Sequence, residues 1–174
     1  IYLFIKRSKT LNRQFDEAIS RILSRVENTA KAEPKGFPHY SDDYGRWVCT
    51  PDGDWTGGFW VGLLWLSYAF SGNERFLTWA KKWMRMLRPR ASSETVFRCF
   101  LFYYGAAIGD ILFEDREARE IAIEGAKELA KLYNPSAKLI PLGRAAEEAE
   151  NVGLDQTNVD GVMSIALLTY AFQK

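Results

Sequence analysis

The stretch at residues 57–70 constrains the fold most, because it has the length of a helix and almost no polar face. A helix that is apolar all round must be covered on every side. The residues just before it, Asp54, Trp55 and Thr56, are polar or aromatic, and two glycines open the helix itself. This kind of entrance predicts a functional site at one end of a buried helical bundle.

Apolar residues recur at helical spacing along the rest of the chain and predict six helices of two alternating kinds. Three carry charged residues on one side and are expected to be half-exposed, at residues 11–26, 76–87 and 114–133. Three have scarcely a charge and are expected to be buried, at residues 57–70, 95–112 and 159–173. Long loops are expected at residues 33–56 and 138–158, and strand signals are weak throughout.

This alternation predicts an all-α fold, made of helical hairpins of an (α/α)6 toroid with about three of the six hairpins present. The similar turns at residues 72–76 and 113–117 lie about 41 residues apart and indicate a hairpin repeat. We expect residues 1–174 to form a single domain that is the N-terminal portion of a larger barrel or is completed by another chain. Three hairpins alone would expose the apolar flanks of their inner helices, which predicts self-association.

Composition and charge exclude several functions. The net charge of +1, without blocks of like charge, gives no electrostatic footprint for nucleic acid. Arg98 and Asp110 interrupt the longest apolar run, so we expect no membrane span. Cys49 and Cys99 form neither a metal-type spacing nor a disulfide framework, which indicates a reducing, cytoplasmic location. With His39 as the one histidine, neither a metal ion nor a cofactor is expected.

Five segments, in order, carry a resemblance to a known family. They are Phe-Pro-His-Tyr at residues 37–40, Asp-Trp-Thr-Gly-Gly-Phe-Trp at 54–60, Leu-Trp-Leu-Ser-Tyr at 64–68 with Gly-Asn-Glu at 72–74, Phe-Leu-Phe-Tyr at 100–103, and Asn-Val-Asp-Gly-Val-Met at 158–163 with a Leu-Leu pair at 167–168. Together these segments resemble glycoside hydrolase family 88, the unsaturated glucuronyl hydrolases, and the related family 105. The resemblance covers about residues 10–174 and implies a six-hairpin glycosidase fold.

The resemblance also implies a reaction and a substrate. In this family a general acid protonates the C4=C5 double bond of a terminal unsaturated uronic acid, water adds at C5, and the hemiketal collapses to release the rest of the oligosaccharide. One carboxyl group can serve as both acid and base, so the two carboxylates of ordinary glycosidases are not required. The expected partner is an oligosaccharide left by a polysaccharide lyase.

Asp160 is the catalytic residue that the resemblance implies. At the start of an apolar helix, burial would raise the pKa of its carboxyl group, whereas the helix N-terminus would lower that pKa. The plain alternative is that Asp160 caps the helix. Val96 and Phe97 stand where the family carries a His-Asp pair, so a second acidic residue is missing there. Glu94 either replaces it in space or is an ordinary first-turn residue.

Four other residues are expected to contact the sugar. Trp55 and Trp47 offer flat apolar faces for a sugar ring, and Asn158 either orients a substrate hydroxyl or simply caps the helix. His39 either lines the site or forms a loop hydrogen bond. Because the inner helices of a toroid run parallel, their first residues share one rim, and the candidates at the helix starts are expected to converge there.

Two other functions remain open. A sugar epimerase of the same general architecture uses histidines as acid and base, and the single His39 argues against it. A non-catalytic or degenerate sugar-binding relative is favoured by Phe97 in the position of an acidic residue and by the short length. That alternative predicts sugar binding without turnover.

Overall fold

The computed structural model describes residues 9–146, 149–153 and 155–174, with side chains from residue 14 onward. The chain divides into two compact units, Ile1–Glu33 and Pro34–Lys174, and each is described separately. The first contains helix α1 (Lys9–Lys31), which spans the helix predicted at residues 11–26. Near its end, Lys31 pairs with Glu27 at 2.9 Å, one turn away. The expectation of a single domain stays a prediction.

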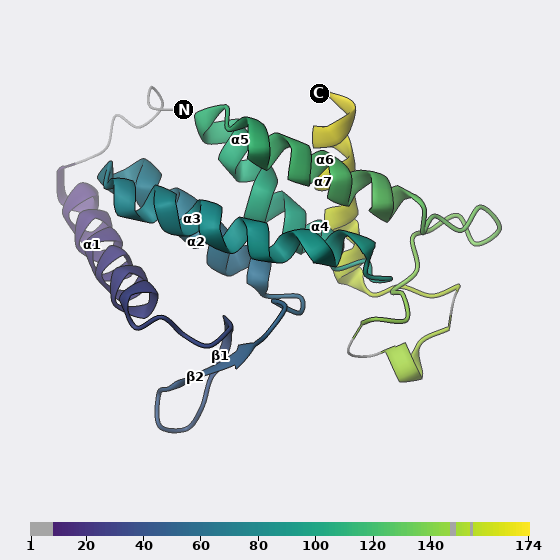
Figure 1. The fold of residues 1–174 in the computed structure, drawn as a ribbon, viewed down its shortest axis with the longest axis horizontal. Coiled ribbons are helices and arrows are strands. Elements are labelled where there is room, and N and C mark those ends of the chain that lie inside the picture. Colours follow the sequence, from purple (N-terminus) through teal and green to yellow (C-terminus); the bar gives the residue numbers. More distant parts are fainter. Residues whose placement is uncertain (1–8, 147–148, 154) are drawn as a thin grey trace. The chain divides into compact units, whose positions relative to one another are not determined.

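The second unit begins with a β-hairpin where only a loop was expected, so the sequence prediction was wrong there. Strands β1 (Phe37–Ser41) and β2 (Trp47–Thr50) pair antiparallel, with an irregularity beside Pro38 (Figure 1). Asp42 fixes the turn, because its Oδ1 accepts hydrogen bonds from the backbone N–H groups two and four residues later. Gly45 completes the turn in the left-handed region, with a φ of 75°.

Helices α2 (Gly57–Ser71) and α3 (Glu74–Leu87) form the first inner and outer pair of this unit and lie side by side (Figure 1). α2 ends at Gly72, which has a left-handed φ of 65° and bonds back into the helix through its N–H. Asn73 then caps α3 through its side chain. The short 3-10 helix η1 (Arg88–Ser92) follows α3. Both predicted helices and the predicted terminator between them are confirmed.

The second inner helix is interrupted by a π-helical turn, although the sequence predicted one regular helix over residues 95–112. Helices α4 (Arg98–Phe102) and α5 (Ile108–Phe113) are joined by the π-helix η2 (Tyr103–Ala107). Trp65 of α2 donates its indole N–H to the Gly105 carbonyl oxygen at 3.0 Å, which satisfies one carbonyl of the distorted turn. Such π-turns occur frequently at functional sites.

Glycines in α2 allow the first two inner helices to touch at the level of the backbone. A Cβ atom on Gly58 would lie 2.2 Å from the Phe100 carbonyl oxygen, and one on Gly62 would lie 3.2 Å from the Tyr104 carbonyl oxygen. The first distance is shorter than any real contact, so the helices could not pack this closely around a larger residue. The glycine-rich entrance is therefore needed for packing as well as for any role in a site.

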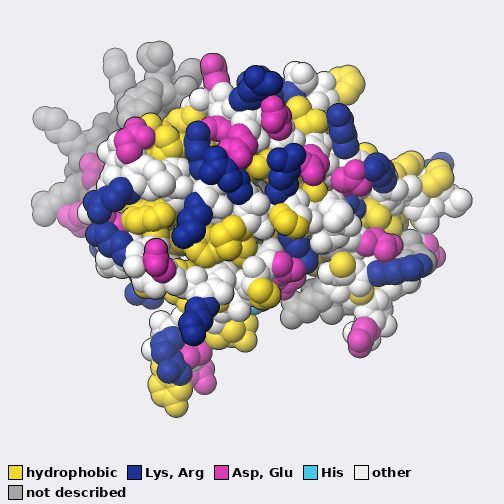
Figure 2. Space-filling view, in the orientation of Figure 1, with side chains coloured by type: hydrophobic (Ala, Val, Ile, Leu, Met, Phe, Trp, Pro, Cys, Tyr) yellow, Lys and Arg dark blue, Asp and Glu magenta, His cyan; other side chains and the backbone are white. Residues whose placement is uncertain are grey.

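The outer helices α3 and α6 (Arg116–Ala130) are joined by ion pairs. Asp115 caps α6 with one oxygen and pairs through the other with the Lys81 Nζ at 2.6 Å. Arg85 forms two parallel bonds of 2.7 Å to the Glu117 carboxylate. Acidic and basic side chains are interspersed over the face shown in Figure 2. The more exposed Arg85–Glu117 pair helps to fix the outer layer but contributes little stability.

The third inner helix begins with the 3-10 turn η4 (Val159–Met163) and continues as α7 (Ser164–Phe172). Part of α7 is buried, whereas Ile165 and Phe172 of α7 and Val162 of η4 are exposed apolar side chains. α2 also exposes apolar side chains on one side. The expectation of burial all round was therefore wrong for α2 and α7, and the exposed inner flanks expected of a three-hairpin arc are found.

The loop between α6 and η4 carries little regular structure. It contains one bridge between Asn134 and Leu139 and the short 3-10 helix η3 (Ala149–Asn151). In the described ranges, no helix combines the length and the apolarity that crossing a bilayer requires.

Candidate active site

The entrance of α2 places His39 and Trp55 side by side. His39, on β1, shares a 2.7 Å hydrogen bond between its Nδ1 and the Thr56 Oγ1. Its ring centroid lies 5.7 Å from that of Trp55. Asp54 adopts a left-handed backbone with a φ of 41°, which is uncommon for a residue with a side chain and turns the chain into α2. The expectation that His39 forms a loop hydrogen bond is confirmed.

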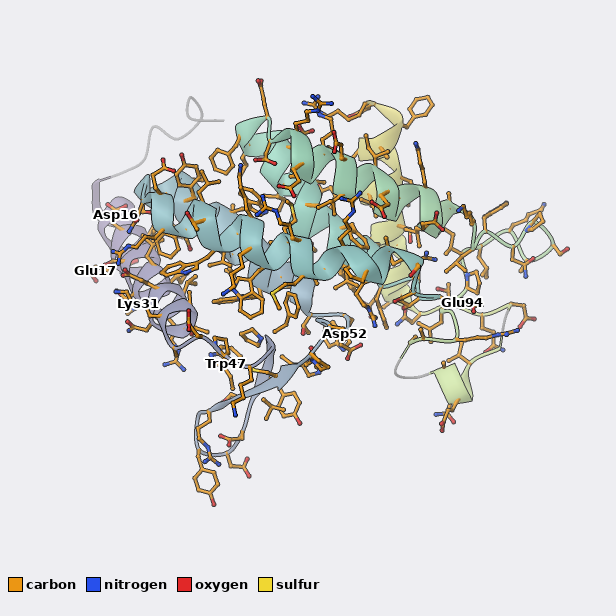
Figure 3. All side chains as sticks on the ribbon, in the orientation of Figure 1. Asp16, Glu17, Lys31, Trp47, Asp52 and Glu94 are labelled. Atoms are coloured by element: carbon orange, nitrogen blue, oxygen red, sulfur yellow. The ribbon has the colours of Figure 1, made fainter. Side chains whose placement is uncertain are left out.

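Arg90 fixes the same entrance from η1, a role that sequence reasoning missed. Its Nη1 lies 2.6 Å from the Asp52 Oδ2, and its Nη2 donates to the Asp54 carbonyl oxygen at 3.4 Å. Figure 3 marks Asp52 at this point, between the hairpin and the helices. The guanidinium therefore ties the segment before α2 to the end of the first helical pair.

Five aromatic rings form a continuous chain of contacts, here called the aromatic wall, from the start of α2 to the π-turn. They are Trp55, Phe59, Phe97, Phe100 and Tyr104, with neighbouring centroids 4.9–6.4 Å apart. Phe97 is 3% exposed and stacks on Phe100 at an interplanar angle of 12°. Of these five residues, the sequence analysis placed only Trp55 in a site. The spacing of residues 97, 100 and 104 marks one helix face and could have indicated the others.

Asp160 lies in the 3-10 turn η4, and its side chain is exposed. The Asn158 Nδ2 donates to the Asp160 Oδ2 at 3.2 Å. Among the residues described, neither side chain bonds to a backbone N–H of η4 or α7, so the capping alternative is not found for either. The burial that was expected around Asp160 is not found either, because its side chain is exposed.

Contacts join the starts of the inner helices to one another. The Cys99 Sγ of α4 lies 4.0 Å from the Asp160 carbonyl oxygen. Phe97, which immediately precedes α4, lies with its ring centroid 6.2 Å from that of Trp55. The structure therefore brings the starts of the three inner helices together at one end, as expected for parallel inner helices.

The structure does not bring Glu94 or Trp47 to Asp160. The exposed Glu94 carboxylate forms a loose ion pair with Arg144, with 3.8 Å between its Oε1 and the Arg144 Nε. Trp47 lies at the turn end of the β-hairpin, where it pairs with Ser41. Figure 3 shows Trp47 and Glu94 on separate parts of the molecule. Within the described ranges no contact links Glu94 to Asp160, so the geometry does not support Glu94 as the replacement acid.

Asn158 has a buried acceptor that lacks a partner in the described part of the chain. Its Oδ1 accepts no hydrogen bond there, whereas its Nδ2 is used by Asp160. A buried unpaired polar atom costs roughly 1–3 kcal/mol, so a donor from a bound molecule would be favoured at this point. The described residues contain no group of three or more His, Cys, Asp or Glu that could hold a metal ion.

Comparisons with known proteins agree with the resemblance drawn from the motifs. Over 161 residues the chain is 29% identical to the unsaturated glucuronyl hydrolase of Bacillus sp. (strain GL1). The aligned region covers 90% of this chain and 42% of that protein. The solved structure of an unsaturated glucuronyl hydrolase from Bacillus sp. GL1 superposes with a TM-score of 0.80 at 27% identity, over 91% of this chain and 42% of the other. The chain is a homologue of the unsaturated glucuronyl hydrolases.

Two further relatives extend this homology. The chain is 24% identical over 162 residues to the unsaturated chondroitin disaccharide hydrolase of Streptococcus pneumoniae, covering 91% of this chain and 40% of that protein. An aspartate-to-asparagine variant of UGL solved with dGlcA-Glc-Rha-Glc superposes with a TM-score of 0.82 at 28% identity, over 91% of this chain and 43% of the other. No family model matches the chain.

The homology also settles the fold. The helical pairs have the six-hairpin glycosidase fold of these neighbours and correspond to about half of its toroid. The chain spans less than half the length of the unsaturated glucuronyl hydrolases it matches.

Proposed function

We propose that this chain carries the general acid and base of an unsaturated glucuronyl hydrolase, and that this residue is Asp160. The observation that supports the assignment is its position: an exposed carboxylate, not used for capping, in a turn whose backbone contacts Cys99 of α4 where the inner helices start. The names of the homologues support the reaction type. Because the chain spans less than half of these relatives, the proposal concerns the full-length protein that contains it.

The proposed reaction needs a single carboxyl group. Protonated Asp160 gives its proton to C4 of the C4=C5 double bond, and the electron pair of that bond forms the new C–H bond. The resulting carboxylate takes a proton from the water that attacks C5, so Asp160 regains its starting state. The hemiketal at C5 then opens to a ketone, and the C1 hemiacetal releases the remaining sugar.

The surrounding side chains supply contacts to the sugar. Trp55, half-exposed at one end of the aromatic wall, offers its ring face to the uronate ring. The unpaired Asn158 Oδ1 accepts a hydrogen bond from a substrate hydroxyl, while the Asn158 Nδ2 orients the Asp160 carboxylate. His39 lies beside Trp55 and borders the same sugar position. Trp47, out on the hairpin, would contact a more distant part of the oligosaccharide.

Two wider expectations belong to the same proposal. Residues 1–174 form the N-terminal portion of a larger toroid, and further hairpins or a second chain cover the apolar flanks of α2 and α7. Cys49 and Cys99 are both free, which favours a reducing, cytoplasmic location.

A second candidate function, sugar binding without turnover, is favoured by Phe97. Its ring is 3% exposed and stacked within the aromatic wall. The position where the family carries an aspartate therefore offers no acid, and Glu94 is paired with Arg144 instead. If the family reaction depends on that second acid, the site would hold its sugar unchanged.

The deciding experiment follows the ultraviolet absorbance of the C4=C5 bond conjugated to the uronate carboxyl group. The full-length protein is mixed with lyase-generated disaccharides, and we expect the absorbance to fall. Asp160→Asn should abolish this fall. Asp155→Asn, which alters another exposed carboxylate of the preceding loop, should leave it unchanged. Binding of the disaccharides without loss of absorbance would support the second candidate function.

A further inference from the structure

The loop before η4 is docked by backbone hydrogen bonds on the segment that leads into α4. The Val96 N–H donates to the Leu142 carbonyl oxygen at 2.8 Å, and the Ala145 N–H donates to the Glu94 carbonyl oxygen at 2.9 Å. Leu142, which is 1% exposed, also donates its own N–H to the Gln156 carbonyl oxygen at 3.0 Å. The segment 142–145 therefore connects the residues that lead into α4 with those that lead into the turn of Asp160.

Gly143 is the residue that permits this docking. Its φ of 90° lies in the left-handed region that favours glycine. A Cβ atom at this position would lie 2.2 Å from the Glu94 carbonyl oxygen and 2.7 Å from the Glu94 carbonyl carbon. Both atoms belong to the backbone, so no side-chain rotation could relieve the clash. Any other residue at position 143 must push the loop away from Glu94.

The turn of Asp160 contacts α4 itself, just after that segment. The Cys99 side chain is fully buried, with its Sγ 4.0 Å from the Asp160 carbonyl oxygen. Burial raises the pKa of the Cys99 thiol to about 12, so this thiol is protected from reagents while the turn stays in place. Access to Cys99 therefore reports whether the turn is seated.

We infer that Gly143 is a positioning residue, which seats the turn of Asp160 on α4 by docking residues 142–145 against Glu94 and Val96. Its meaning for catalysis rests on the proposed role of Asp160, whereas the seating of the turn is a property of the fold. Gly143 would affect the reaction only indirectly, because backbone hydrogen bonds of its segment, and no side chain of its own, connect it to the turn of Asp160.

The experiment measures how fast a thiol reagent modifies Cys99 in the full-length protein. Cys49→Ser, with any other cysteines of the full-length protein also replaced, provides the background, so that only Cys99 is counted. We expect Gly143→Ala to raise the rate at least about tenfold, since local opening exposes the thiol. Gly45→Ala is the matched control: its φ of 75° carries the same backbone strain, but a Cβ there would meet nothing within 4 Å. That control should leave the rate unchanged.

A second variant guards against a loss of folding. If circular dichroism shows that Gly143→Ala does not fold, Ala145→Pro takes its place, because it removes the N–H bonded to Glu94 without changing the glycine. An unchanged Cys99 rate in a folded variant would overturn the inference.

Turnover is measured on the same variants. With an active parent protein, kcat should fall about 100-fold for a displacement of the catalytic group by about 1 Å, with a much smaller change in KM. If Cys99 is modified faster but kcat is unchanged, the position of the Asp160 turn on α4 does not matter for catalysis, and that part of the inference is overturned. If the parent converts no disaccharide, the proposed function fails, and the Cys99 rates still decide whether Gly143 seats the turn.

Discussion

Tyr170 of α7 donates its hydroxyl to the Asp110 Oδ2 of α5 at 2.7 Å, at the end of α7 away from Asp160. The Asp110 carboxylate is fully buried and is also reached by Arg119 Nη2 and Lys174 Nζ, each at 2.8 Å. A buried charge is tolerated only when such partners satisfy it. This cluster therefore joins the second inner helix to the third at the rim opposite the candidate site.

Removal of the Asp110 carboxylate should destabilise the protein. Asp110→Ala leaves Tyr170 and the two cationic groups without their shared acceptor, and breaking a buried pair costs about 3–5 kcal/mol. Because Arg119 and Lys174 are partly exposed, water should compensate part of this loss, so we expect about 3 kcal/mol in the free energy of unfolding measured with urea. Asp160→Ala, which removes an exposed carboxylate, should change that free energy little. Equal effects of the two substitutions would contradict this account.

The same cluster predicts a loss of stability in acid. Burial alone would raise the pKa of Asp110, but hydrogen bonds from Arg119, Lys174 and Tyr170 outweigh it and lower the pKa from 3.8 to about 2. A depressed folded-state pKa adds stability above the unfolded value, and this stability is lost as pH falls from about 4 to about 2. Thermal unfolding across this range should show the loss, and Asp110→Asn should weaken the dependence. An Asp110→Asn protein with the same acid dependence as the parent would assign that dependence to other carboxylates.

Gly58 should be much less tolerant of substitution than Gly62 on the same helix. A Cβ on Gly58 meets backbone atoms of α4 at 2.2 Å, whereas one on Gly62 meets its first neighbour at 3.2 Å. Gly58→Ala should therefore lower the free energy of unfolding by about 1–3 kcal/mol through overpacking. For Gly62→Ala, the better helix propensity of alanine, worth about 1 kcal/mol, offsets much of a smaller clash. Urea unfolding of both variants would show the difference, and equal losses would mean that α2 and α4 adjust freely.

The helical part of the fold was predictable because its pattern is local. The apolar run at residues 57–70 and the terminator after it predicted α2, and the predicted end lies within one residue of the observed one. The β-hairpin was missed because the turn built by Asp42 depends on side-chain hydrogen bonds, and the prolines and glycines of this region hide any alternation. The π-turn was missed for a similar reason, since Trp65 reaches Gly105 from another helix.

The candidate site was predictable only where helix starts alone determine it. Trp55 and Asp160 could be placed at one rim because parallel inner helices share their starts. The direction of Glu94 could not be predicted, because its partner Arg144 is placed by the loop that docks through Gly143. The burial expected around Asp160 failed because nothing in the described residues covers η4 on its exposed side.

Trp55 should contribute to sugar binding more than Trp47 does. Trp55 belongs to the aromatic wall beside the start of α4, whereas Trp47 is 42% exposed at the turn end of the hairpin. Loss of a ring contact worth about 1 kcal/mol raises KM about fivefold, and we expect this for Trp55→Ala with kcat nearly unchanged. Trp55→Phe should keep most of the binding, because a flat ring remains. Trp47→Ala is the matched control, and a larger rise in KM for it would place the sugar ring along the hairpin instead of at the aromatic wall.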